Sequence, residues 1–153
     1  MKQKVSDYIA DRLAQEGICQ VFTVTGGGAM HLNDSLGHHP GLTCLYQHHE
    51  QAAAMAAEAY ARVDNRMAAV CVTSGPGATN AITGALCAWM DSIPMLVFSG
   101  QARYATTVSA SGLPLRSMGV QECNIVPVVK SLTKYAHMIV HPENIRYHLE
   151  KAL

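Results

Sequence analysis

Four short apolar segments alternate with helical segments along this sequence. We predict strands over residues 20–24, 42–46, 67–72 and 94–99, because each is apolar and bounded by turn residues. The segment 67–72 is apolar throughout, which is typical of a parallel strand covered on both faces. Strands that alternate with helices form a parallel sheet. The predicted fold is therefore α/β, an open parallel β-sheet with helices on both faces.

The helical segments are predicted from spacing and end signals. Val5, Ile9 and Leu13 recur every four residues, which predicts an amphipathic helix with Ser6 or Asp7 as its cap and Gly17 at its end. Further helices are predicted over 29–36, 47–62, 78–90, 125–129 and 142–152, and a last strand over 135–140. Residues 100–119 are rich in Thr, Ser, Gly and Pro, and loops of this length are usually functional or mobile.

Composition narrows the class of protein. The 153 residues are 49% hydrophobic and 14% charged, which indicates one globular domain over residues 1–153. Eleven basic residues balance eleven acidic ones, so no nucleic-acid partner is expected. The apolar stretches are too short to span a membrane, and no signal-like segment opens the chain, so we expect a cytoplasmic protein. The chain stops within its last predicted helix, which suggests a piece of a longer protein.

The cysteines and histidines do not predict a metal site. The five cysteines are scattered, and none form Cys-x-x-Cys, so reduced buried thiols are expected rather than disulfides or zinc ligands. His38-His39 and His48-His49 are the obvious metal candidates. Because adjacent side chains point to opposite sides, neither pair is expected to bind one ion.

Two glycine-rich turns follow predicted strands. Thr25-Gly26-Gly27-Gly28 follows the first and Thr73-Ser74-Gly75-Pro76-Gly77 the third. In open parallel sheets the carboxyl ends of the strands line the ligand crevice, and glycine permits close backbone approach. Neither turn matches the fingerprints of phosphate or dinucleotide sites. The pattern fits a ligand crevice, and it also fits plain turn glycines.

Glu50 stands at the head of a helical segment that is otherwise built largely of small apolar residues. Alanines let another surface approach closely, and a poorly solvated acid is biased toward its neutral, hydrogen-bond-donating form. Such a group suits a heterocyclic nitrogen. Glu58 and Arg62, four residues apart, are expected to form a structural surface pair worth roughly a few tenths of a kcal/mol. Asp91 either caps the loop before Pro94 or contacts a partner subunit.

Several separated motifs together resemble one family. They are Val21 to Gly27, His49 to Ala53 with Ala57 to Arg62, Val72 to Asn80, Met90 to Pro94, and Ser99-Gly100-Gln101. In this order they resemble the amino-terminal pyrimidine-binding domain of thiamine-diphosphate enzymes, with the greatest likeness to the large catalytic subunit of acetolactate synthase. The resemblance covers essentially the whole chain and implies the thiamine-diphosphate-binding fold.

The resemblance implies roles for particular residues. Glu50 matches the acid that hydrogen-bonds N1′ of the cofactor's aminopyrimidine, and Gln121 matches the active-site glutamine near the reacting carbons. These two are the implied catalytic residues. The implied cofactor-binding residues are Thr25, Gly26, Glu50, Thr73, Pro76 and Asn80.

The resemblance also implies a reaction and partners. It implies a transferase that decarboxylates a 2-keto acid such as pyruvate and joins the remaining carbons to a second carbonyl, as in branched-chain amino acid biosynthesis. The implied cofactors are thiamine diphosphate, Mg²⁺ and, in the full-length enzyme, FAD. Mg²⁺ is held by a Gly-Asp-Gly motif that this sequence lacks. Active sites of this family form between subunits, so we expect a fragment of a three-domain enzyme, inactive alone and part of a homodimer or tetramer.

Three departures leave the acceptor substrate open. The loop between Gln101 and Gln121 carries extra residues around 105–116, Val120 replaces an aromatic residue, and Thr25 stands where proline is common. Similar loops occur in acetolactate-synthase-like proteins of sugar or polysaccharide pathways. The alternatives are therefore a thiamine-diphosphate decarboxylase or carboligase of such a pathway, and a non-catalytic dimerisation or binding module.

Overall fold

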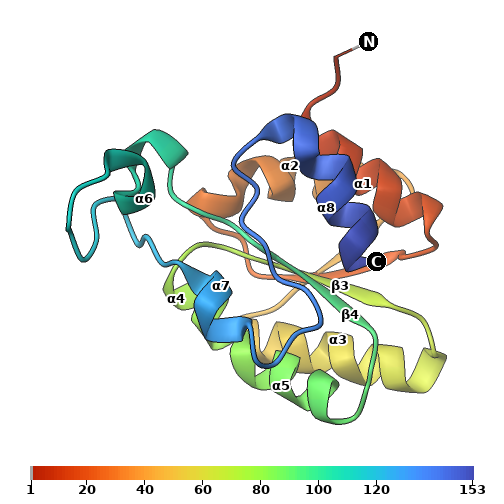
Figure 1. Ribbon diagram of the computed structural model, residues 1–153. Coiled ribbons are helices and arrows are strands. Elements are labelled where there is room, and N and C mark those ends of the chain that lie inside the picture. The colour runs from red at the N-terminus through yellow and green to blue at the C-terminus, as the bar shows by residue number, and fades with distance from the viewer. Residues whose placement is uncertain (1) are drawn as a thin grey trace.

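A four-stranded parallel sheet organises the computed structural model, which describes residues 2–153 (Figure 1). The strands are β1 (Gln20–Thr23), β2 (Thr43–Tyr46), β3 (Ala68–Val72) and β4 (Met95–Ser99), in the order β2-β1-β3-β4. Val21 of β1 is opposite Cys44 on one side and Ala69 on the other. All five residues of β3 are buried, as its continuous apolar sequence predicts. The predicted open parallel sheet is confirmed.

Helices cover both faces of the sheet (Figure 1). On one face lie α1 (Val5–Gln15), α2 (Met30–His38) and α8 (Ile145–Ala152), and on the other lie α3 (Glu50–Asp64) and α5 (Ile82–Met90). The side chains of a strand alternate between its two faces. Cys71 of β3 accordingly packs with Leu13 and Leu36, whereas Val70 packs with the buried alanines of α3. The alanine-rich helix α3 therefore packs directly against the sheet.

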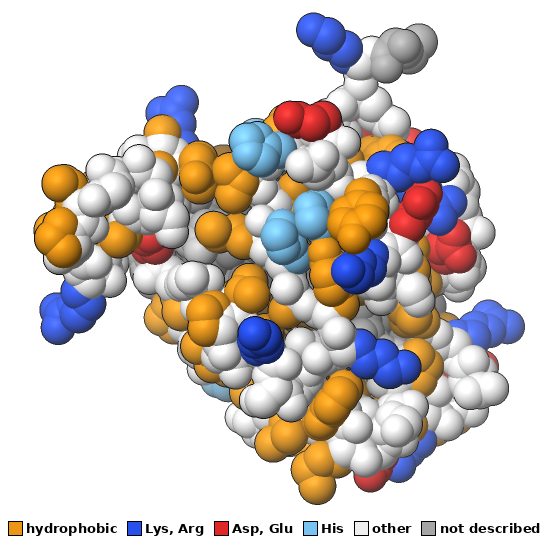
Figure 2. Space-filling model, viewed as in Figure 1, with side chains coloured by type: hydrophobic (Ala, Val, Ile, Leu, Met, Phe, Trp, Pro, Cys, Tyr) orange, Lys and Arg blue, Asp and Glu red, His pale blue; other side chains and the backbone are white. Residues whose placement is uncertain are grey.

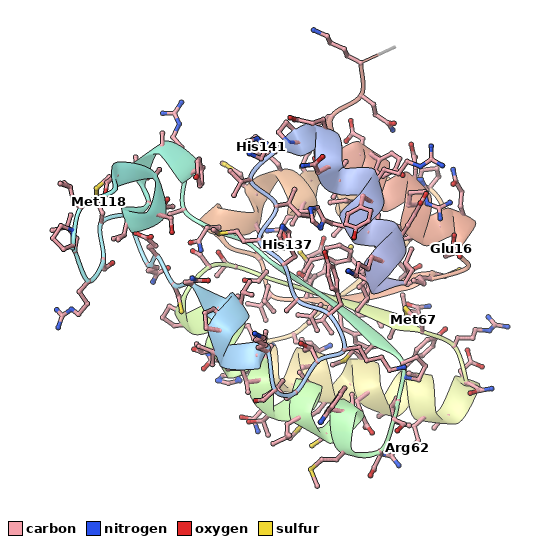
Figure 3. All side chains as sticks on the ribbon, in the orientation of Figure 1. Glu16, Arg62, Met67, Met118, His137 and His141 are labelled. Atoms are coloured by element: carbon pink, nitrogen blue, oxygen red, sulfur yellow. The ribbon has the colours of Figure 1, made fainter. Side chains whose placement is uncertain are left out.

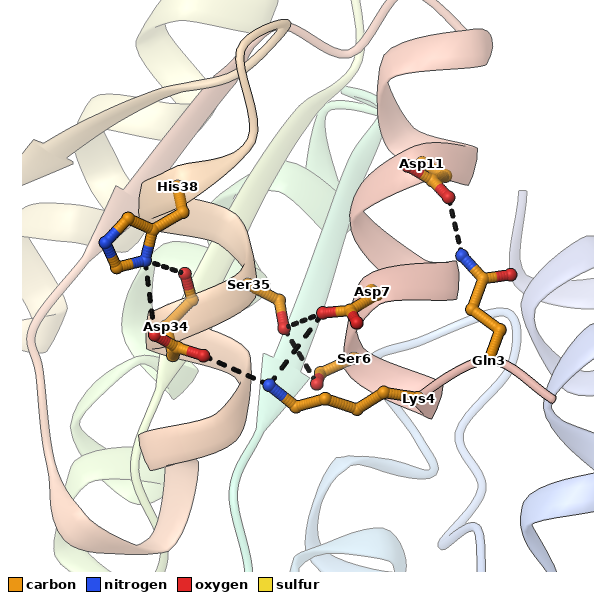
Figure 4. Close-up of polar contacts among 8 residues, drawn as sticks. All are labelled: Gln3, Lys4, Ser6, Asp7, Asp11, Asp34, Ser35 and His38. Carbon is orange, nitrogen blue, oxygen red and sulfur yellow. Dashed lines mark hydrogen bonds and ion pairs between the residues drawn. The ribbon is translucent and has the colours of Figure 1, made fainter.

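Polar side chains join α1 to α2 (Figure 4). Ser35 Oγ donates a hydrogen bond to Asp7 Oδ1 at 2.6 Å and lies 2.8 Å from Ser6 Oγ, while Lys4 Nζ donates to Asp34 Oδ2 at 3.1 Å. Neither Ser6 nor Asp7 caps α1, which begins one residue before Ser6 without a side-chain cap. The predicted cap is wrong because Ser35 of the neighbouring helix contacts both side chains.

Short elements complete the chain. They are η1 (Gly27–Ala29), α4 (Pro76–Asn80), η2 (Tyr104–Thr106), α6 (Val108–Ser111), α7 (Ile125–Val129) and η3 (Pro142–Asn144). The helix predicted over 78–90 is divided at Ala81 between α4 and α5. Gly17, with φ of +76°, lies just past α1 as predicted. No helix within residues 2–153 has the length and apolar character needed to cross a bilayer.

The segment 135–140 is not a strand, so that prediction is wrong. Its alternate side chains contact α8 instead. The hydroxyl of Tyr135 lies 2.5 Å from Nδ1 of His148, and the ring of His137, labelled in Figure 3, stacks on His148 with centroids 3.9 Å apart. Alternate side chains of this segment, Tyr135 and His137, pack against α8, and the backbone does not pair with the sheet.

Arg62 of α3 links its helix to the end of α5. Its Nε donates to Glu58 Oε1 at 2.9 Å, which confirms the predicted pair, and its Nη2 donates to Asp91 Oδ2 at 2.6 Å. The sequence did not indicate this contact for Asp91. All five cysteines are free, as predicted, but Cys71 alone is buried, and burial raises the pKa of its thiol to about 12. Cys19 is exposed, so the prediction of buried thiols is wrong there.

Gly84 sets the separation of α3 and α5. A Cβ atom at this position would lie 2.5 Å from Ala54 Cβ and 2.7 Å from the Ala54 carbonyl carbon. We expect Gly84→Ala to lower the free energy of unfolding by about 1–3 kcal/mol, because backbone must move to admit the methyl group. Urea unfolding of this chain measures the change.

Gly37→Ala is the matched control for Gly84→Ala. Gly37 also lies within a helix, but the nearest atom to an added Cβ is the Tyr46 hydroxyl at 3.4 Å. Alanine should be neutral there or stabilising by up to about 1 kcal/mol, because it is the better helix former. Equal destabilisation by the two substitutions would contradict the close contact of α3 with α5.

Candidate functional site

The turn at residues 73–77 lies against the first glycine turn. Thr73 Oγ1 accepts a hydrogen bond from the backbone N–H of Gly28 at 3.1 Å. A Cβ atom at Gly26 would lie 2.4 Å from Thr73 Cβ, so no side chain fits between the two turns. The two turns that follow β1 and β3 therefore converge, as expected at the carboxyl ends of neighbouring parallel strands.

Glu50 faces this turn from the start of α3. The helix is capped by His49, whose Nδ1 accepts a hydrogen bond from the N–H of Gln51 at 3.1 Å. Asn80 Nδ2 donates to Glu50 Oε2 at 2.9 Å, and a Cβ atom at Gly77 would lie 3.2 Å from Oε1. The carboxylate is half-buried, which is less enclosed than its alanine-rich surroundings predict. One oxygen is held by Asn80, and the other faces a position without a side chain.

Gln121 reaches the same turn through its backbone. Its carbonyl oxygen would lie 2.3 Å from a Cβ atom at Gly75, and both residues have positive φ, +53° at Gln121 and +59° at Gly75. The Gln121 side chain is exposed. Thr25 is exposed directly before Gly26, and Pro76 is exposed as the first residue of α4. The structure thus brings Glu50, Asn80, Thr73 and Gly26 together, with Gln121, Thr25 and Pro76 at the edge.

Glu122 closes the long loop after β4, a role that the sequence analysis missed. Its carboxylate accepts hydrogen bonds from the backbone N–H groups of Val108 at 2.8 Å, Met118 at 3.1 Å and Gly119 at 3.0 Å. Figure 3 shows Met118 on the part of the loop that projects from the body. Because the donors lie 3, 4 and 14 residues away, only the folded loop identifies Glu122. These three hydrogen bonds hold Glu122 in place, and Glu122 directly follows Gln121.

The Glu122 contact should respond to pH. The backbone N–H groups, Gly119 first, hold the pKa of the carboxyl below its ordinary value of 4.5. A lowered pKa stabilises the folded loop above about pH 4.5, and this stabilisation is lost as pH falls through the lowered value. We expect the amide NMR shifts of Val108, Met118 and Gly119 to titrate together, with a midpoint below 4.5.

Two variants test the assignment of that titration. Glu122→Gln should abolish it, whereas Glu143→Gln should leave it unchanged, since Glu143 is an exposed glutamate of η3 outside the loop. A midpoint at or above the ordinary glutamate value would contradict the assigned contacts.

No three metal-ligating side chains cluster anywhere in the described residues 2–153. His49 caps α3, and His38 Nδ1 contacts Asp34. Glu50, Asn80 and the two glycine turns form the candidate site in this chain.

Comparison with known proteins gives a consistent picture. The family model for the thiamine pyrophosphate enzyme N-terminal TPP binding domain matches residues 3–114. The acetolactate synthase isozyme 3 large subunit of Escherichia coli K12 is 37% identical over 96% of this chain and 24% of its own length. The acetolactate synthase large subunit of Lactococcus lactis is 35% identical over 88% of this chain and 22% of its own length. The chloroplastic acetolactate synthase of Arabidopsis thaliana is 32% identical over 98% and 21%.

The chain spans about a quarter of the length of these relatives. The family match includes both glycine turns, Glu50 and Asn80, and the fold agrees with it. This chain therefore belongs to the family of thiamine pyrophosphate enzyme N-terminal TPP-binding domains.

Proposed function

We propose that this chain is the pyrimidine-binding domain of a longer acetolactate-synthase-like enzyme that depends on thiamine diphosphate, with Glu50 as its catalytic acid. The observation that carries the proposal is the Glu50 carboxylate, oriented by Asn80 and placed against the glycine turn at Gly77. The relatives that cover nearly all of this chain are acetolactate synthases about four times as long.

Groups at this turn can offer a hydrogen bond to an aminopyrimidine ring. A Cβ atom at Gly77 would lie 3.2 Å from Glu50 Oε1 and 2.7 Å from Thr73 Cγ2, so the glycine lets Glu50 and Thr73 pack close to the turn. Asn80 engages Oε2, and within residues 2–153 no group hydrogen-bonds Oε1, so Oε1 is the oxygen that remains for a ligand. A carboxyl oxygen of this kind meets the need of a ring nitrogen for a hydrogen bond. The residues that would hold the ring are Thr25, Gly26, Glu50, Thr73, Pro76 and Asn80.

The chain's own residues supply position and proton control. Thiamine diphosphate, when bound, supplies the electron sink that lets a 2-keto acid lose carbon dioxide and join a second carbonyl. Glu50 would hold or release a proton at Oε1, the oxygen that Asn80 does not engage, and from there would hydrogen-bond the ring nitrogen. Asn80 keeps the carboxyl group in that orientation. Gln121 presents its exposed amide beside the turn and hydrogen-bonds the reacting substrate.

The remaining components lie outside this chain in the proposal. Mg²⁺, and flavin if the enzyme uses it, bind to other domains, and a partner subunit completes the site in a homodimer or tetramer. Large apolar side chains exposed on α3 and α5 support such an interface, because exposed apolar groups mark interaction surfaces. They are Met55, Leu86, Trp89 and Met90. Figure 2 shows apolar side chains in the lower part of the view, where α5 lies in Figure 1.

An acceptor screen tests the proposed function. The full-length protein, supplied with thiamine diphosphate and Mg²⁺, should release carbon dioxide from pyruvate, and product analysis with pyruvate, 2-ketobutyrate or aldehydes identifies the acceptor. Use of pyruvate or 2-ketobutyrate would support a role in branched-chain amino acid biosynthesis. Preference for another carbonyl would support the sugar-pathway alternative, which the extended loop and Val120 favour. Absence of any decarboxylation would support a non-catalytic module.

A further inference from the structure

A cavity of about 400 Å³ lies between the first glycine turn and the base of the long loop. Its volume falls in the range of small-molecule sites, about 300–1,000 Å³. Glu50 does not line it, but Ser74, which does, belongs to the 73–77 turn that Glu50 faces. The lining residues that matter chemically are Gly27, Gly28, Ser74, Arg103, Val120 and Gln121.

Hydrogen bonds fix the wall that carries Arg103. Gln101 Nε2 donates to the carbonyl of Cys123 at 2.7 Å, and its Oε1 accepts from the N–H of Ala102 at 2.8 Å. The carbonyl of Arg103 accepts from both the N–H and the hydroxyl of Thr106, each at 2.8 Å. The backbone on both sides of Arg103 is therefore held by hydrogen bonds, so the position of Arg103 beside the cavity is fixed.

The cavity lining combines one cation with neutral polar side chains that can donate hydrogen bonds. Ser74 is 4% exposed, and among residues 2–153 its hydroxyl makes no hydrogen bond. Arg103 is the single charged residue of the lining, and no carboxylate of the described chain pairs with it. The exposed amide of Gln121 adds a further donor. A cation and two neutral donors, with no acid among the lining residues, match a carboxylate or phosphate group.

We propose that this cavity binds the anionic group, a carboxylate or a phosphate, of a substrate. Arg103 pairs with the anion, and the Ser74 hydroxyl and Gln121 amide donate hydrogen bonds to it. A planar guanidinium suits both oxyanions because it can donate two parallel hydrogen bonds. That the anion belongs to a substrate rests on the proposed function, whereas the presence of an anion site does not. Arg103, on the extended loop, becomes a residue that selects the substrate.

Anion binding to the full-length protein tests this inference. The protein is saturated with thiamine diphosphate, so that the cofactor's own phosphate site is filled, and titrated calorimetrically with inorganic phosphate and with acetate. We expect Arg103→Ala to weaken binding of at least one of these anions by about tenfold or more, since a charge-assisted hydrogen bond is lost. Ser74→Ala, which removes only the hydroxyl, should weaken binding of the same anion by a few-fold.

Arg116→Ala is the matched control, because Arg116 is an exposed arginine of the same loop that does not line the cavity. It should leave both affinities unchanged. A loss for acetate alone identifies a carboxylate site, and a loss for phosphate alone identifies a phosphate site. Equal affinities in Arg103→Ala, Arg116→Ala and the unmodified protein would overturn the inference. Unchanged turnover in Glu50→Gln would remove the proposed function instead and leave the anion measurement standing.

Discussion

Glu50→Gln in the full-length protein is expected to reduce 2-keto acid turnover by about 10²–10⁴-fold, the usual contribution of a positioned acid or base. The amide has the shape of the carboxyl group but cannot hold or release the proton. One amide oxygen can still accept the hydrogen bond from Asn80, which is 2.9 Å from the carboxylate. We therefore expect the variant to fold and to bind thiamine diphosphate within a few-fold of the unmodified protein.

Carbon dioxide release and proton exchange at C2 of the bound cofactor measure this effect. Glu58→Gln is the matched control, because Glu58 lies on the same helix and pairs with Arg62 away from the glycine turns. It should keep its activity. If Glu50→Gln and Glu58→Gln turned over equally fast, Glu50 would have no catalytic role and the proposed function would be wrong.

Gly75→Ala is expected to have the largest effect on stability. Gly75 has φ of +59° and ψ of −119°, which an L side chain rarely adopts, and its added Cβ would lie 2.3 Å from the carbonyl oxygen of Gln121. Backbone strain and the clash together should lower the free energy of unfolding by about 2–5 kcal/mol. Any relief of the clash must move Gln121, so turnover of the full-length protein should fall as well.

Gly112→Ala separates strain from clash. Gly112 also has positive φ, +65°, but nothing lies within 4 Å of an added Cβ. Alanine there should cost only about 1–2 kcal/mol, the penalty of the left-handed conformation. Urea unfolding compares the two variants, and turnover should be kept in Gly112→Ala. Equal loss of stability would show that Gln121 does not pack on the turn.

The fold was largely predictable because its signals are local. The apolar run 67–72 predicts a strand buried on both faces, and β3 is that strand. The glycine turns after β1 and β3 announce a shared crevice, because the carboxyl ends of parallel strands meet at one edge of the sheet. The prediction over 135–140 is wrong because an alternating pattern does not state its partner, and here the partner is His148 of α8.

Contacts between distant residues were not predictable. Ser6 has the chemistry of a helix cap, but Ser35, 29 residues away, takes its hydroxyl. Asp91, at the end of α5, accepts a hydrogen bond from Arg62 of α3. The Glu122 carboxylate accepts hydrogen bonds from three backbone N–H groups of its loop. In each case a polar side chain had several possible partners in the sequence, and burial and chain path chose between them.

Periodicity and glycine placement in the sequence indicated the parallel sheet, whereas the family and the role of Glu50 were implied by the resemblance of several separated motifs. Tertiary structure alone decided that Asn80 orients that acid, that Gln121 packs on Gly75, and that Arg103 and Ser74 face one cavity. The physical reason is one of range. Backbone preference and hydrophobic pattern act over a few neighbouring residues, whereas a site is made by side chains whose distances are set only when the sheet and its loops have packed.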